Sequence, residues 1–129
     1  MEMASRDEDV SLLITMLGIG IYSAMLIKAE IADISRFQHH TNLVSYAGLN
    51  PSIKSSGDSI YHGRITKQLR WILVQCANVA IRNDEYIRNF YERIKARKEH
   101  NVAIVATARK MLVCVYYMLT RRDAYNPYR

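Results

Sequence analysis

The sequence predicts an all-α protein of five or six helices. Apolar residues recur every three or four positions on both sides of one polar stretch, and no segment shows the strict alternation of a half-buried strand. Of the 129 residues, 50% are hydrophobic and 23% are charged, which is the composition of an ordinary globular domain. A chain of this length forms one domain with a core of its own.

The first two helices flank the stretch LGIG at residues 17–20. A helix capped by Ser5 or Asp7 is expected to run to about Leu17, and a second helix covers about 22–32. The residues expected on the apolar face of the first helix are Leu12, Leu13, Met16 and Leu17.

The remaining helices are expected over 41–48, 65–83 and 85–100 and from about 101 onward, after an irregular segment at 33–40. Thr41 opens the first of these and Gly48 closes it, while Asn83 or Asp84 caps the charged helix over 85–100. In the two longest helices the residues expected to face the core are Leu69, Ile72, Leu73, Cys76, Val79 and Ala80, and then Val105, Ala108, Leu112, Val115 and Leu119.

Charge is divided unevenly along the chain. Residues 1–53 carry three cations and six acids, whereas residues 54–129 carry fifteen cations and six acids. An excess of this kind favours a polyanionic partner, most often nucleic acid, and a solvated basic helix face is the alternative. Within the charged helix, Glu92 and Glu99 alternate with basic residues at spacings that favour ion pairs.

The sequence disfavours a secreted or membrane protein. The N-terminal stretch MEMASRDEDV is acidic, whereas a secretory signal begins with basic residues. The longest uncharged run, residues 10–27, contains glycines and polar residues, so we expect no membrane span. Cys76 and Cys114 lie in apolar helical stretches, which is typical of core residues in a reducing cytoplasm. We therefore expect a cytoplasmic protein.

No set of side chains in the sequence predicts a metal site. His39 and His40 are adjacent and diverge on regular structure, and His62 and His100 lie far from them along the chain. The acids cluster at a helix start or alternate with cations, and no set of them stands out as a two-metal nuclease site. We therefore expect no metal ligands in this chain.

The stretch LLITMLGIGIYSAMLIKAEI has the pattern of a helix-hairpin-helix, which we place at 11–32. Gly18, Ile19 and Gly20 would form the turn, because glycine lets the backbone turn tightly and approach another chain. The free amides at the start of the second helix would then bind DNA phosphates without reading bases. The alternative is an ordinary helical hairpin that uses glycine for packing.

A long polar stretch, NPSIKSSGDSIYHGRITK, separates the two halves of the chain. Loops of this length in small domains are usually functional or disordered. Ser55 and Ser56 precede a glycine, with Lys54, Arg64 and Lys67 nearby. A serine becomes a nucleophile when a base or a metal activates it and cations stabilise the phosphoryl centre. By its residues alone, this pattern is more typical of a flexible turn than of a nucleophile.

Three stretches in this order, AEIADISRF, YAGLNPS and SSG…GRITK, resemble the C-terminal domain of the RuvC-like (DEDD) serine transposases of insertion sequences. The resemblance is close over residues 11–80 and looser up to 119. It implies that Ser56, directly before Gly57, is the nucleophile, with Ser55 as the second candidate. The residues expected to contact DNA are Gly18, Ile19, Gly20, Lys54, Arg64, Lys67 and Arg70.

The resemblance also implies partners. The family's N-terminal nuclease-like domain supplies four metal-binding acids, and we expect it to be absent here because Met1 directly precedes the hairpin. A divalent metal, magnesium, would be held by that domain and not by this chain. DNA, a structured guide RNA, and the missing domain or a second copy are the partners implied. Within one domain over 1–129, we expect the hairpin to be followed by a serine loop at 49–63 and a helical bundle at 64–122.

The sequence departs from the family directly after the serine loop. Only Gln68 stands between Lys67 and Leu69, where family members have a glycine and several further residues. A deletion here would shorten the joint to the next helix and change the placement of Ser56. The rival hypothesis is a non-catalytic helical module that binds nucleic acid or mediates oligomerisation.

Overall fold

The computed structural model describes residues 2–50 and 66–127, with side chains from residue 8 onward. The predicted fold class is confirmed, because the described residues form six α-helices and one short 3₁₀ helix and contain no strand. The α-helices are α1 (Glu2–Leu13), α2 (Ile21–Ile31), α3 (His40–Tyr46), α5 (Lys67–Asn83), α6 (Glu85–Lys95) and α7 (His100–Arg121), and the 3₁₀ helix is Ile34–Arg36.

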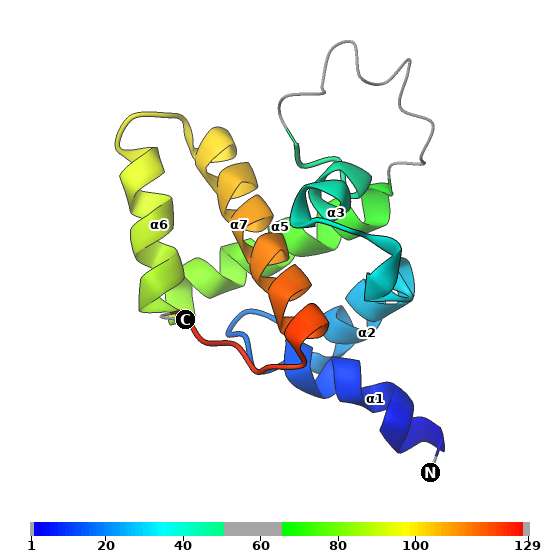
Figure 1. Cartoon of the computed structure of the whole chain (residues 1–129). Helices are drawn as coiled ribbons and strands as arrows, with labels where there is room; N and C mark the ends of the chain where they lie inside the picture. The colour runs from blue at the N-terminus through cyan, green and yellow to red at the C-terminus, as the bar shows by residue number, and fades with distance from the viewer. Residues whose placement is uncertain (1, 51–65, 128–129) are drawn as a thin grey trace, which may run out of the picture.

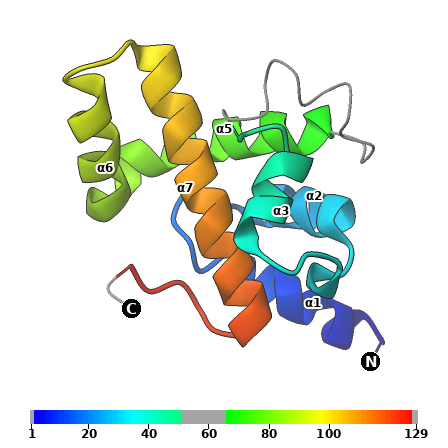
Figure 2. The same cartoon turned by 45° about the horizontal axis from the view of Figure 1, so that its top comes forward.

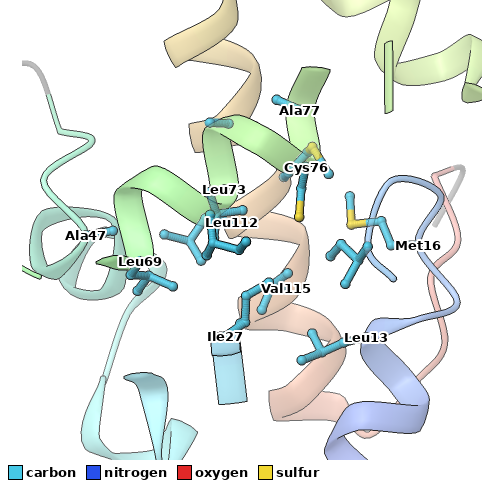
Figure 3. Packing of buried hydrophobic residues seen from close by; sticks show 14 of the residues in the cluster. Leu13, Met16, Ile27, Ala47, Leu69, Leu73, Cys76, Ala77, Leu112 and Val115 are labelled. Atoms are coloured by element: carbon cyan, nitrogen blue, oxygen red, sulfur yellow. The ribbon is translucent and has the colours of Figure 1, made fainter. Parts of the chain in front are cut away.

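Helix α7 is the centre of the fold. It contacts α1, α3, α5 and α6, and Figures 1 and 2 both show it between α6 on one side and α3 on the other, with α5 crossing it. The side chains in Figure 3 point toward one another from α1, α2, α5 and α7 and from the turn after α1. The hydrophobic core therefore joins the N-terminal hairpin to the helices that follow the serine loop.

Helix α7 is long and apolar enough to cross a membrane by length and composition. However, 61% of its most apolar window is buried inside the protein. Burial against four other helices is the pattern of a core helix.

The turn between α1 and α2 differs from the sequence prediction. Helix α1 begins at Glu2 and ends at Leu13, so the predicted caps and the predicted end near Leu17 are wrong. Gly18 takes the left-handed conformation, with φ of +104°, and packs directly against α5. Leu17, expected in the core, has 51% of its surface exposed because it lies in the turn and no longer on a helix face.

Most other helix ends follow local chemistry. Asp84 caps α6 as predicted, since its Oδ1 accepts from the backbone amides of Tyr86 and Ile87 at 2.9 and 3.3 Å. Gly48, with φ of +73°, closes α3 as predicted. Helix α3 begins at His40, one residue earlier than predicted, and its cap residue is His39 in place of Thr41.

Helix α5 buries the predicted residues with one exception. Leu69, Ile72, Leu73, Cys76 and Ala80 are all buried, whereas 38% of the surface of Val79 is exposed. At about 100° per residue, Val79 lies just outside one edge of the arc that the other five define, and Ala77, which is buried, lies outside the other edge.

Charged contacts hold the two ends of the chain together. Lys28 Nζ lies 2.6 Å from Asp9 Oδ2, and Arg122, at the end of α7, pairs with both Asp9 and Glu8. Burial alone would raise the pKa of Asp9, but hydrogen bonds from Lys28 and Arg122 outweigh it and hold that pKa below its ordinary value. The ion pairs predicted for Glu92 and Glu99 on or beside α6 are not among those that the described residues form.

Candidate functional site

The three hairpin residues predicted to contact DNA lie in different environments. Ile19 is buried, and its amide donates to the carbonyl of Met16 at 3.0 Å. A Cβ on Gly18 would lie 2.8 Å from both the Cβ of Ala80 and the carbonyl oxygen of Cys76. Gly20 is exposed, and no atom lies within 4 Å of where its Cβ would be. Gly20 is therefore the member of the three that is open to another molecule.

Gly20 also starts α2 without a side-chain cap. The first amides of an α-helix have no partner inside the helix, so an uncapped start can donate to an anion. The chain thus has the backbone donors that the helix-hairpin-helix hypothesis requires, and whether they bind DNA stays a prediction.

Apolar side chains surround this turn, which sequence reasoning missed. The exposed large hydrophobic residues of the turn and α2 are Ile14, Leu17, Ile21, Tyr22 and Met25, and we call them the hairpin patch. Tyr22 is the most exposed of them, with 70% of its surface accessible. The signal was present in the sequence, because the hairpin carries more apolar residues than one helix face can bury.

The predicted serine loop at 49–63 falls largely within residues 51–65, which lie outside the described residues and which we call the serine loop from here on. Ser55 and Ser56, together with Lys54 and Arg64, fall within 51–65. The structure does place Lys67 and Arg70, which are exposed in the first turn of α5. Because residues three apart share a helix face, these two cations extend along one side of α5 from the end of the loop.

The residue that follows the serine loop is fixed from two directions. The Thr66 amide donates to the Tyr46 carbonyl at 3.0 Å, and Thr66 Oγ1 donates to Glu30 Oε1 at 2.6 Å. The same hydroxyl oxygen accepts from the Leu69 amide at 3.2 Å and so caps α5. Thr66 is buried, and Glu30 belongs to α2, so the hairpin is tied directly to the end of the loop.

The residues that precede the loop are held by α3 and α7. The Leu49 amide donates to the Val44 carbonyl at 3.0 Å, and Asn50 Nδ2 donates to Ser45 Oγ at 3.1 Å. Arg109 of α7 donates from Nη1 to the Leu49 carbonyl at 3.3 Å. Both flanks of the serine loop are therefore attached to α3, which places the hairpin, the loop ends and α7 in one body.

Sequence reasoning assigned no role to Glu30 or Arg109. Their contacts to Thr66 and Leu49 join residues that are 36 and 60 positions apart. No local motif marks such a pair, because the contacts exist only after the helices have packed.

The remaining reactive groups do not form a site. Burial raises the pKa of the Cys76 and Cys114 thiols, which disfavours the thiolate that would act as a nucleophile. Among the described residues, no three His, Cys, Asp or Glu side chains are grouped so that they could hold a metal ion.

The sequence model of the transposase IS116/IS110/IS902 family matches residues 10–92 of this chain. The chain belongs to this family. The matched region covers the hairpin, the serine loop, α5 and most of α6. Membership confirms the transposase part of the resemblance seen in the sequence.

Curated relatives agree with this assignment. The chain is 34% identical over 113 residues to the "Insertion element IS110 uncharacterized 43.6 kDa protein" of Streptomyces coelicolor, a match that covers 83% of this chain and 28% of the relative. It is 28% identical over 135 residues to the "Transposase for insertion sequence element IS1111A" of Coxiella burnetii, covering 96% of this chain and 36% of that protein. It is 30% identical over 134 residues to an IS900 protein of Mycobacterium paratuberculosis, covering 98% and 33%.

The chain therefore spans 28% to 36% of the length of these relatives. Its family links it to transposition and to mobile insertion elements.

Proposed function

We propose that this chain is the DNA-binding C-terminal domain of a RuvC-like (DEDD) transposase and contributes the serine nucleophile to DNA recombination. The observation that carries the proposal is the family match over residues 10–92, which includes the hairpin, the serine loop and the start of α5. The Thr66 contacts support it, because a loop that carries a nucleophile needs a fixed end from which to position it.

In the proposed reaction, Ser56 Oγ attacks the phosphorus of a DNA phosphodiester. A new oxygen–phosphorus bond forms, and the bond to one deoxyribose oxygen breaks. That oxygen leaves with the bonding electron pair and takes up a proton, while the serine proton passes to a base or to water. Arg64 and Lys67 would stabilise the negative charge that develops on the phosphoryl oxygens.

The magnesium ion implied by the resemblance belongs, in this proposal, to the RuvC-like domain. That domain, or a second copy of this chain, is a proposed partner, together with DNA and a structured guide RNA in the cytoplasm. DNA phosphates would be contacted by the exposed side chains of Lys67 and Arg70 at the start of α5. The free backbone amides at the start of α2, directly after Gly20, would contact them as well. By itself the chain would bind DNA and leave it uncut.

We expect Ser56→Ala to abolish covalent capture of DNA when a RuvC-like domain is supplied. Loss of the attacking oxygen removes the covalent link altogether, so the adduct should fall by about 100-fold or more. Denaturing gel electrophoresis of the protein with labelled DNA measures the adduct.

Ser55→Ala is the matched control, since it changes the neighbouring hydroxyl and is expected to keep capture within about twofold. The opposite pattern would transfer the role to Ser55. Full capture by both single variants would end the nucleophile assignment.

The hairpin patch favours a second candidate function, a module for oligomerisation. Contiguous exposed apolar residues often mark a protein interface, and the patch comprises five large hydrophobic side chains. Sedimentation velocity of the chain with and without Met25→Ser tests this idea. A monomer for the unmodified chain at every concentration would contradict it.

A further inference from the structure

A cleft of about 430 Å³ lies between α3, α6 and α7. Figures 1 and 2 show α7 between the other two helices. Residues from all three helices line the cleft. Its volume lies within the range of small-molecule sites, about 300–1,000 Å³. The described residues that line it are basic, amide, imidazole, hydroxyl and apolar, with no acid among them. The family resemblance assigns no role to this cleft.

Two adjacent basic residues of α7 line this cleft. Arg109 and Lys110 are both half-buried, and neither takes part in any ion pair among the described residues. Arg109 uses one N–H of its guanidinium on the Leu49 carbonyl, and a guanidinium has five. A charge that is partly removed from water is costly unless it is paired, so an anion in the cleft would relieve that cost for both.

An imidazole lines the same cleft. His40 Nδ1 is buried and has no hydrogen-bond partner among the described residues.

The lining of the cleft also has apolar members, among them an aromatic ring. Phe90 of α6 is half-buried, and the Lys110 ammonium lies 5.6 Å from the centre of its ring. Val44 and Val113 add apolar surface from α3 and α7. A ligand that matches this lining has a flat apolar part and an anionic part. A nucleotide has both, in its base and its phosphate.

The position of the cleft connects it to the serine loop. Asn50 lines the cleft and directly precedes the loop, and Arg109 holds the carbonyl of Leu49 beside it. A nucleotide bound here would lie next to one flank of the loop.

We infer that the cleft binds one unpaired nucleotide of a DNA strand, with its phosphate on Arg109 and Lys110 and its base against Phe90. The inference rests on the proposed function for the source of the DNA. The inference goes beyond the proposed function, because it concerns single-stranded DNA and residues outside the serine loop and the hairpin.

The test compares binding of a fluorescent single-stranded oligonucleotide and of a duplex to the full chain by anisotropy. The double variant Arg109→Gln/Lys110→Gln is expected to bind the single strand about tenfold or more weakly and to keep duplex affinity within about twofold. Loss of the contacts to this one phosphate should also make the slope of log K against log salt shallower by about 0.7 for the single strand.

The matched control is Arg97→Gln/Lys98→Gln, which makes the same change of net charge at two exposed residues between α6 and α7. It should leave the single-strand slope unchanged. Because Arg109 also holds Leu49, Lys110→Gln and Phe90→Leu are tested singly as well, since no hydrogen bond among the described residues involves these two side chains. Each is expected to weaken single-strand binding about threefold or more, with an unchanged melting temperature.

Equal losses in the cleft and control variants would overturn the inference, as would unchanged single-strand binding in Lys110→Gln and Phe90→Leu. Tighter binding of an RNA strand than of DNA of the same sequence would overturn the assignment to DNA. If the unmodified chain bound the single strand and no duplex, the proposed function would fail while the cleft inference survived.

Discussion

Replacing Gly18 by alanine is expected to destabilise the fold by about 2 to 6 kcal/mol. The residue has φ of +104°, a conformation that costs side-chain-bearing residues about 1–3 kcal/mol. The new Cβ would also lie 2.8 Å from the Cys76 carbonyl oxygen and the Ala80 Cβ, and both atoms belong to a packed helix that cannot move away cheaply. Overpacking of this kind costs about 1–3 kcal/mol more.

Gly20→Ala is the matched control, two residues away in the same turn. Its φ is −83°, and nothing lies within 4 Å of the added atom, so only the poorer capping of α2 by alanine remains and stability should change by less than about 1 kcal/mol. Urea unfolding followed by circular dichroism measures both variants. Equal stability of the two would contradict the close packing of the turn on α5.

Replacing Leu112 by alanine is expected to destabilise the fold by about 2 to 5 kcal/mol. Leu112 is fully buried on α7, the helix that contacts α1, α3, α5 and α6. The packed core around this fully buried side chain prevents complete collapse around the lost methyl groups, so a cavity remains and adds its cost to the lost burial. Most of the stability of a domain of this size, about 5–15 kcal/mol in total, depends on such contacts.

Leu17→Ala makes the same chemical change at a residue with 51% of its surface exposed. Its cost should stay below about 1 kcal/mol because much less apolar surface returns to water. Thermal unfolding of both variants measures the difference. A loss at Leu17 as large as that at Leu112 would show that the turn is packed differently in solution.

Local chemistry explains what could be predicted of the fold. Asp84 was predictable as a cap because its carboxylate needs only the amides two and three residues ahead. Gly48 was predictable because a helix end in the left-handed conformation favours glycine. Val79 was not, since helical periodicity fixes the direction of the buried face and not its width.

The candidate site divides in the same way. The serines and the basic residues around them were predicted from a local motif and from a resemblance to a family. The bond from Thr66 to Glu30 and the contact from Arg109 to Leu49 depend on how α2, α3, α5 and α7 pack. The hairpin shows most clearly what local sequence cannot predict. Gly18 and Gly20 are the same residue in the same turn, yet Gly18 packs against α5 and Gly20 has no atom within 4 Å of where its Cβ would be.

The central claim is that this domain binds DNA through phosphate contacts. It is tested most directly by anisotropy titration of the purified chain against a short duplex across a salt series. Contacts from Lys54, Arg64, Lys67 and Arg70 would give a slope of log K against log salt of about −3.6. A slope near zero, or no binding at roughly 50 mM salt where such contacts are strong, would contradict the account.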